Sequence, residues 1–199
     1  MSLPADYFEQ LFTDSPDPWA FRQRWYEKRK RDLCLASLGQ QRYPRVFEPA
    51  CANGELSLAL AERSEHLLCL DASATAVDLT RQRLHALPHC RVLHGYLPDD
   101  WPPGQFDLIV LSEVGYYLDA EHWRRTLEHA VASLAVDGTL LACHWLHPIA
   151  DCPQTGHQVH ALLARHLPLH RVVRHEEPDF LLELWCRQPS AIDLNEHTL

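Results

Sequence analysis

The stretch that decides the fold is Val46-Phe47-Glu48-Pro49-Ala50-Cys51-Ala52-Asn53-Gly54-Glu55-Leu56. Val46 and Phe47 are typical of a short buried strand, and the apolar residues that recur from Leu56 onward predict an amphipathic helix. A loop of small residues lies between the two. Such a loop lets backbone N–H groups approach a ligand closely, and the positive end of the helix dipole favours a negative group there.

An acidic residue follows the loop at a distance that suits nucleoside binding. The next predicted strand, residues 67–71, ends in Asp71, roughly twenty residues after the loop, where a carboxylate can reach ribose hydroxyls. The loop holds one glycine, Gly54, whereas a dinucleotide fingerprint begins with two. Glu48 at the end of the first strand suits a cationic group such as an ammonium. The pattern predicts a nucleoside site, and an ordinary α/β turn of small residues is the alternative.

Length, charge and cysteine content exclude several classes of protein. The 199 residues suit one domain with a short appendage, and the net charge of -9 disfavours a nucleic-acid partner. The seven cysteines include no C-x-x-C pair, which is typical of reduced thiols in the cytoplasm. The first residues do not have the order of a signal peptide, and no apolar stretch approaches a membrane span. We therefore expect a cytoplasmic protein with neither a membrane nor a nucleic-acid partner.

Strands and helices alternate through residues 41–189, which predicts an α/β core with a doubly wound, mostly parallel sheet. Predicted strands cover residues 45–48, 67–71, 90–94, 106–111 and 139–144. Predicted helices cover residues 56–64, 73–87, 120–134 and 155–167. The strand at residues 106–111 is almost wholly apolar, as expected for a strand that is covered on both faces.

The C-terminal part of the core breaks this alternation. Two apolar runs, residues 169–176 and 179–187, are joined only by Glu177-Pro178, a link too short for a parallel crossover. They predict an antiparallel hairpin that closes the sheet. Residues 190–199 beyond it are predicted to be a disordered tail.

A helical cap segment is predicted ahead of the core, over residues 1–40. A short helix around residues 7–12 is broken by Asp14-Ser15-Pro16-Asp17-Pro18, and a longer helix follows over residues 19–38. The longer helix carries six of the eighteen lysines and arginines. The ordinary interpretation of these charges is a solvated helix face, and the alternative is a cation that pairs with a cofactor carboxylate or an acidic substrate.

Four stretches together make the pattern more specific: residues 17–30 around Trp19 and Trp25, Glu48-Pro49-Ala50-Cys51, residues 106–118, and residues 144–148. They resemble the nodulation protein S group of S-adenosylmethionine-dependent class I methyltransferases. The resemblance covers about residues 15–188. It implies a seven-stranded Rossmann-like methyltransferase fold, S-adenosylmethionine as the cofactor, and methylation of the free amine of a deacetylated chitin-like oligosaccharide.

The resemblance also implies a set of cofactor-binding residues at the strand ends and in the cap: Tyr26, Glu48, Ala50, Asn53, Gly54, Asp71, Ala72, Tyr96, Leu97, Ser112 and Glu113. The chain departs from the group at some positions. Ala50 stands where glycine is usual, and Tyr96 stands where such enzymes often place an acid near the adenine, which an aromatic ring could instead stack on. Gly115 and Leu146 stand where larger or basic residues are expected.

Methyl transfer from a sulfonium is an in-line displacement, so the protein must align the donor with the acceptor and exclude water. An amine acceptor must arrive neutral, which a nearby base or a desolvating pocket assists. Open α/β sheets place their ligands at the carboxyl ends of the strands. The candidate catalytic residues at these ends are Glu113, Tyr117, His144 and His147, with Tyr116 as a further candidate.

The predicted function is methyl transfer from S-adenosylmethionine to a small-molecule acceptor, most simply N-methylation of an amino sugar or a related amine. A nicotinamide-dependent oxidoreductase is one alternative, disfavoured by the loop glycines and the hairpin, and a non-catalytic nucleoside-binding module is the other. No metal site is predicted. Cys143 and His144 are neighbours on a strand and point to opposite faces, and the histidine spacing matches no closed zinc pattern.

Overall fold

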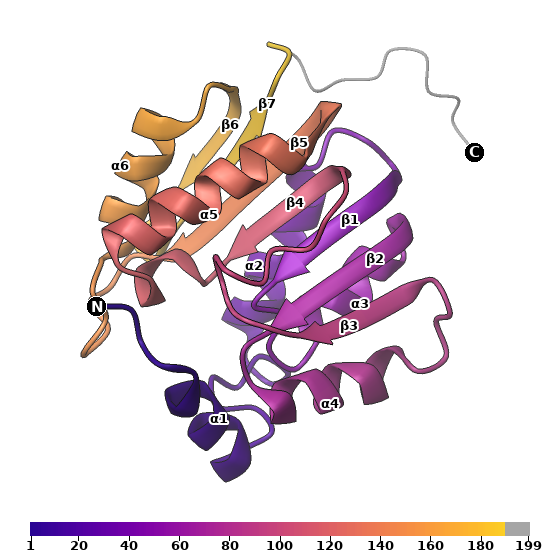
Figure 1. Ribbon diagram of the computed structural model, residues 1–199, viewed down its shortest axis with the longest axis vertical. Coiled ribbons are helices and arrows are strands. Elements are labelled where there is room, and N and C mark those ends of the chain that lie inside the picture. The colour runs from indigo at the N-terminus through magenta and orange to yellow at the C-terminus, as the bar shows by residue number, and fades with distance from the viewer. Residues whose placement is uncertain (190–199) are drawn as a thin grey trace.

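Seven strands form one sheet in the order β3-β2-β1-β4-β5-β7-β6 in the computed structural model, which describes residues 1–189 (Figure 1). The predicted tail, residues 190–199, lies outside the described residues. The strands are β1 Tyr43–Pro49, β2 Ser64–Asp71, β3 Cys90–His94, β4 Phe106–Ser112, β5 Leu134–Trp145, β6 His170–Glu176 and β7 Phe180–Cys186. The helices are α1 Ala5–Asp14, α2 Trp25–Ser37, α3 Glu55–Ala61, α4 Ala74–Leu84, α5 Ala120–Ser133 and α6 Gly156–His166, with the 3-10 turn η1 Gly115–Tyr117.

The pairing of the strands confirms the predicted fold. The strands β3, β2, β1, β4 and β5 are parallel, and β7 pairs antiparallel with both β5 and β6. Val46 of β1 lies opposite Leu67 on one side and Leu108 on the other. The carboxyl ends of β1, β2 and β4 therefore meet at one edge of the sheet. Glu48 and Asp71 lie at the ends of β1 and β2 there, and the residues that follow Ser112 leave β4 at the same edge.

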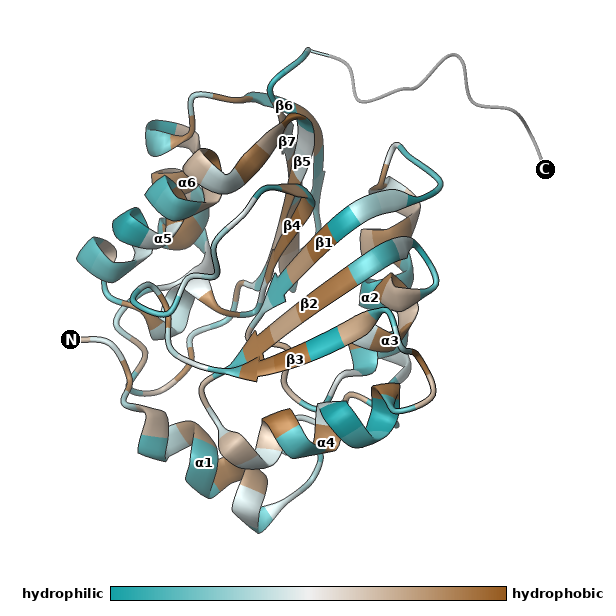
Figure 2. Cartoon of the chain, turned by 45° about the vertical axis from the view of Figure 1, so that its right-hand side comes forward, coloured by the Kyte–Doolittle hydropathy of each residue, from teal (hydrophilic) through white to brown (hydrophobic). Residues whose placement is uncertain are grey.

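Two hydrophobic clusters lie on opposite faces of the sheet. On one face Leu108 and Val110 of β4 share a cluster with residues of α2, α3 and α4, and on the other Ile109 and Leu111 share a cluster with residues of α5 and α6 (Figure 1). Figure 2 shows hydrophobic residues along β2 and β4. This double burial explains the unbroken apolar run of β4. No helix among residues 1–189 combines the length and the apolarity that crossing a bilayer requires.

The predicted helix over residues 19–38 is wrong in its first part, because α2 begins only at Trp25. Residues 18–23 form turns instead. The Asp17 carboxylate accepts hydrogen bonds from the main-chain N–H groups of Phe21 and Arg22, at 2.8 and 3.1 Å. Ala20 has a left-handed φ of 57°. A short acidic side chain that binds nearby N–H groups competes with the helix for them, and this delays the helix start.

Two further boundaries differ from the prediction. The helix α3 ends at Ala61, so β2 begins at Ser64 rather than at residue 67. The strand β5 begins at Leu134 rather than at residue 139, because Leu134 is buried and pairs with Phe106. The register shifts between Phe106 and Leu108, and this irregularity accommodates residues 135–138, which lie between the predicted helix and the predicted strand.

Trp123 of α5 is fully buried, and its indole N–H donates to the carbonyl of Val159 in α6 over 3.2 Å. We expect Trp123→Ala to lower the free energy of unfolding by about 3–5 kcal/mol, because the cavity that it leaves cannot collapse fully. The control is Val136→Ala at an exposed position, expected to change stability by less than about 0.5 kcal/mol. Urea unfolding measures both, and equal effects would contradict the packing described.

Candidate functional site

A cavity of about 410 Å³ opens at the carboxyl ends of β1, β2 and β4, beneath residues of α1 and α2. Ten of the eleven residues predicted to bind the cofactor line it: Tyr26, Glu48, Ala50, Asn53, Asp71, Ala72, Tyr96, Leu97, Ser112 and Glu113. Gly54 is outside the lining. It precedes α3 with a φ of 77°, and a Cβ there would lie 3.1 Å from side-chain atoms of Thr80 and Arg83. Gly54 therefore shapes the loop and does not face the cavity.

The loop after β1 is held in an uncommon backbone conformation. Ala50 and Ala52 have left-handed φ values of 57° and 52°. The N–H of Ala52 donates to Asp71 over 2.8 Å, and its carbonyl accepts from the Thr80 hydroxyl over 2.8 Å. Asp71 also accepts from the N–H of Ser73, the residue that caps α4, over 2.9 Å. These fixed partners hold two alanines where glycine is the usual residue.

Two polar atoms in the lining have no hydrogen-bond partner among the described residues. They are the side-chain oxygen of Asn53 and the hydroxyl of Tyr26, and both are buried. The amide nitrogen of Asn53 donates to the Pro16 carbonyl and to the Asp17 carboxylate, at 3.1 and 3.0 Å, and so fastens the cap segment to the loop. A buried polar atom without a partner is costly, so these two atoms indicate a ligand with complementary polar groups.

Two acids at the strand ends are deeply buried. Burial raises the pKa of Glu48 to about 8, and the nearby charge of Asp71 adds to this shift. Burial also raises the pKa of Asp71, to about 6, although main-chain N–H donors, Ser73 foremost, oppose the shift. A cation that entered the cavity beside Glu48 would favour its ionised form, so binding of a cation there is coupled to release of a proton.

Glu113, which also lines the cavity, is the centre of a second polar cluster. It follows β4 with a φ of 55°, and its carboxylate accepts from Lys30 over 2.8 Å, from the N–H of Trp145 over 3.2 Å and from the Tyr116 hydroxyl. Lys30 also pairs with Glu27 at 3.0 Å. Burial opposes the charge of Lys30, but the carboxylates of Glu113 and Glu27 outweigh it and raise the pKa of the lysine.

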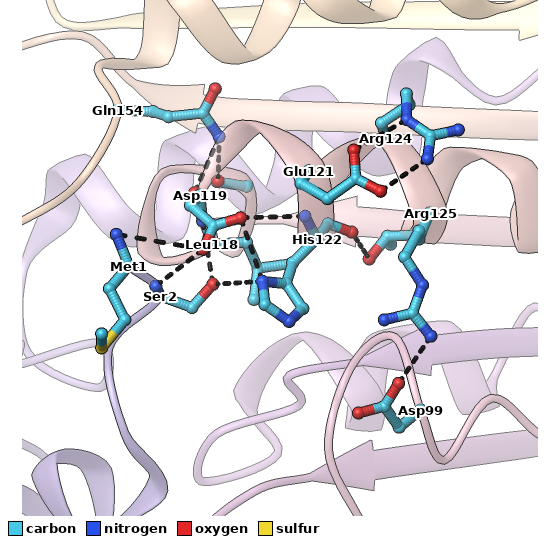
Figure 3. A network of polar contacts seen from close by, with 12 residues as sticks. Met1, Ser2, Asp99, Leu118, Asp119, Glu121, His122, Arg124, Arg125 and Gln154 are labelled. Carbon is cyan, nitrogen blue, oxygen red and sulfur yellow. Dashed lines mark hydrogen bonds and ion pairs between the residues drawn. The ribbon is translucent and has the colours of Figure 1, made fainter.

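The first residues of the chain close one side of the cavity. Leu3, Ala5 and Phe8 belong to the lining, and the Phe8 ring meets the Tyr117 ring edge-on with centroids 5.0 Å apart. The N–H of Leu3 donates to the carbonyl of Tyr117 over 2.9 Å. Ser2 binds Asp119 at the start of α5 through main-chain and side-chain contacts (Figure 3).

The structure brings together two of the four predicted catalytic residues, Glu113 and Tyr117, which both line the cavity. His144 and His147 lie outside the lining. The His144 ring is fully buried and faces His160 of α6, and His147 is exposed and pairs with Asp179 at 2.6 Å.

Apart from Tyr26, the lining residues that the cap segment supplies were not among the predicted site residues. These residues are mostly aromatic or basic: Phe8, Phe12, Trp19, Phe21, Arg24, Lys30 and Arg31. The available signal was the density of aromatic residues before the loop. The six clustered basic residues also have mixed roles, since Lys28 pairs with Asp32 on an exposed face whereas Lys30 is buried.

Comparisons with known proteins agree with the resemblance carried by the sequence motifs. The family model described as "Nodulation protein S (NodS)" matches residues 7–167. Nodulation protein S of Rhizobium tropici is 31% identical over 143 residues, which is 71% of this chain and 59% of that protein. The chain spans between 59% and 65% of the length of the three nodulation S proteins that it matches.

Solved structures give a similar picture. The crystal structure of a candidate methyltransferase from Pseudomonas syringae is 54% identical, covers 82% of this chain and 100% of that one, and has a TM-score of 0.75. The N-methyltransferase NodS from Bradyrhizobium japonicum WM9, in complex with S-adenosyl-L-homocysteine, is 24% identical, covers 92% of this chain and 97% of that one, and has a TM-score of 0.81. The second likeness shows a shared fold.

The raised pKa of Glu48 makes stability depend on pH in the ligand-free protein. The usual pKa of glutamic acid is about 4.3, and the folded protein holds the proton of Glu48 up to about pH 8. Between these values the folded state binds more protons than the unfolded state, so stability falls as pH rises. Glu48→Gln lacks this titration. Its free energy of unfolding should therefore increase relative to that of the wild type from about pH 5 to about pH 8.

Urea unfolding of both proteins across this pH range measures the difference. Asp71 titrates in both proteins, so its contribution cancels in the difference between their free energies of unfolding. Parallel stability curves would contradict the assignment of a neutral, buried Glu48.

Proposed function

Since this chain belongs to the nodulation protein S family, we propose that it transfers the methyl group of S-adenosylmethionine to the amine of a small acceptor of the amino sugar class. The predicted family is confirmed. The structure of NodS from Bradyrhizobium japonicum WM9 contains S-adenosyl-L-homocysteine, which supports S-adenosylmethionine as the cofactor. The observation that carries the proposal is that one cavity is lined by two groups of polar residues: buried Glu48, Asp71 and Asn53, and Glu113 with Tyr117.

The lining fits the cofactor group by group. Asp71 would accept from ribose hydroxyls, Glu48 would pair with the ammonium, and Arg24 or Arg31 would meet the carboxylate. The partnerless oxygen of Asn53 and the hydroxyl of Tyr26 would gain polar partners. Bound here, the cofactor would supply a methyl group on a positively charged sulfur.

The base of the cofactor would meet a less polar part of the lining, formed by Ala72, Tyr96 and Leu97. Tyr96 is 40% exposed, so its ring is free to stack.

The acceptor end has groups that can hold an amine. Glu113 already accepts hydrogen bonds from Lys30, Tyr116 and Trp145, which fix its orientation and neutralise part of its charge. A carboxylate engaged in this way orients an amine better than it removes a proton. The apolar residues Leu3 and Ile149 in the lining exclude water, which favours the neutral amine.

Methyl transfer can be tested with substrates that differ only at the nitrogen. We expect transfer of labelled methyl from S-adenosylmethionine to glucosamine or its short oligomers, and none to the N-acetylated counterparts, whose nitrogen has no free lone pair. Calorimetry with S-adenosylhomocysteine and NAD runs in parallel. Heat with NAD alone would favour the oxidoreductase alternative, and tight S-adenosylhomocysteine binding without transfer to any amine would favour the non-catalytic module.

Asp71→Asn should weaken the binding of S-adenosylhomocysteine by about ten-fold to a hundred-fold, because hydrogen bonds to a charged group contribute about 1.5–3 kcal/mol. Asparagine keeps the size of the side chain and one acceptor oxygen for the loop. Calorimetry measures the affinity, and circular dichroism checks the fold. Unchanged affinity in the folded variant would mean that Asp71 only holds the loop to α4.

Glu113→Gln should raise the apparent KM for the amine about ten-fold or more with little rescue at higher pH, because loss of an orienting contact falls on acceptor binding. Tyr117→Phe is the companion variant. Steady-state kinetics against pH separate this outcome from loss of a general base, which typically lowers turnover about 10²–10⁴-fold. A loss of turnover that shrinks as pH rises would assign proton removal to Glu113.

A further inference from the structure

A chain of hydrogen bonds runs from turn η1 through two buried histidines to β7. The main-chain N–H of Gly115 donates to Nε2 of His144 over 3.1 Å. Nδ1 of His144 lies 3.1 Å from Nε2 of His160, and Nδ1 of His160 lies 2.8 Å from Oε2 of Glu183. His144, His160 and Glu183 are buried, and none of them lines the cavity.

The donors and acceptors in this chain have one consistent direction. A main-chain N–H can only donate, so Nε2 of His144 accepts and Nδ1 carries the ring proton. That proton is donated to Nε2 of His160, whose own proton then lies on Nδ1 and is donated to Glu183. Both imidazoles are therefore neutral. Burial is the main cause that lowers the pKa of His144 well below its usual value, which agrees with a neutral ring at this position.

Glu183 anchors the far end of the chain. Its second oxygen accepts from Arg171 and Arg174, at 2.8 and 3.2 Å. Two arginines keep the carboxylate charged in a buried place, and a charged carboxylate is a strong acceptor for the His160 N–H.

The other end of this hydrogen-bond chain lies at Gly115 in turn η1, which is tightly packed. A Cβ on Gly115 would lie 2.5 Å from Val159 and 3.1 Å from His144, so a larger residue fits only if the Val159 side chain moves or shortens. The Gly115 carbonyl accepts from the amide of Gln154, which also donates to the carbonyl of Leu118 (Figure 3). Both backbone groups of Gly115 are thus bound by buried side chains. Its lack of a side chain, unexpected from the family pattern, follows from this close approach.

We propose that His144, His160 and Glu183 form a positioning relay for turn η1. The turn carries Tyr116, which donates to Glu113, and Tyr117, which lines the cavity. The relay therefore sets the place of the acceptor end without touching the acceptor. His144 is a positioning residue in this scheme, and its role rests on the proposed methyl transfer only for the kinetic readout.

Two substitutions of His144 test whether its acceptor for the Gly115 N–H positions the turn. The amide oxygen of glutamine reaches the place of Nε2 and can accept from Gly115, whereas asparagine reaches only the place of Nδ1 and leaves that N–H without a partner. We expect His144→Asn to lower kcat about ten-fold to a hundred-fold with cofactor affinity retained, because small misplacements of reacting groups cost rates of that order. His144→Gln should recover most of the loss. Equal kcat values in the two variants would overturn the relay.

A second pair of variants acts one residue further from the cavity. His160→Gln offers His144 an acceptor oxygen, and His160→Leu offers none. We expect His160→Leu to have a lower kcat than His160→Gln, although a residue at this position cannot contact the acceptor. If both variants fold and turn over at the wild-type rate, the relay does not act on the turn.

The tautomer of His144 gives a readout that needs no acceptor. Nitrogen–proton correlation spectra of protein labelled with 15N-histidine should show His144 neutral, with its proton on Nδ1, at about pH 7. A proton on Nε2, or a charged ring, would overturn the relay. Absence of methyl transfer in the wild-type protein would instead contradict the proposed function and leave this spectrum unaffected.

Discussion

The parallel pairing of β1 with β2 and β4 is the constraint on which the rest of the structure depends. Strands that run in the same direction end at the same edge, and helices cover both of their faces, so their middle residues must be apolar. Polar side chains are then confined to the strand ends. Glu48, Asp71 and Glu113 gather around one cavity for this reason, although sixty-five residues separate the first from the last.

The gathering of these strand ends could be predicted because each strand end is marked by residues adjacent in the sequence. The small residues after β1 and the acid at the end of β2 each follow an apolar run directly, so their place at the sheet edge needs no knowledge of distant contacts. The short Glu177-Pro178 link similarly fixes the hairpin of β6 and β7. Ten of the eleven residues predicted for cofactor binding therefore lie together in the lining of the cavity.

The rest of the cavity lining depends on contacts between distant segments, which a local pattern does not contain. The cap segment reaches the cavity because Asn53 binds Pro16 and Asp17, thirty-seven and thirty-six residues earlier. His144 does end a strand at the correct edge, but its ring points toward α6 and the Gly115 N–H. Strand position predicts the edge on which a residue lies, and packing decides the face to which its side chain turns.

The tight contact at Gly115 has a consequence for how this protein can diverge. Gly115, Val159 and His144 come from three different elements. The side chains of Val159 and His144 occupy the space that a side chain at position 115 would need. A lineage that gained a side chain at position 115 would first have to shorten Val159 and release the imidazole from its present place. Single-step mutation is therefore a poor route to a reshaped turn η1, and the three positions are expected to change together or remain as they are.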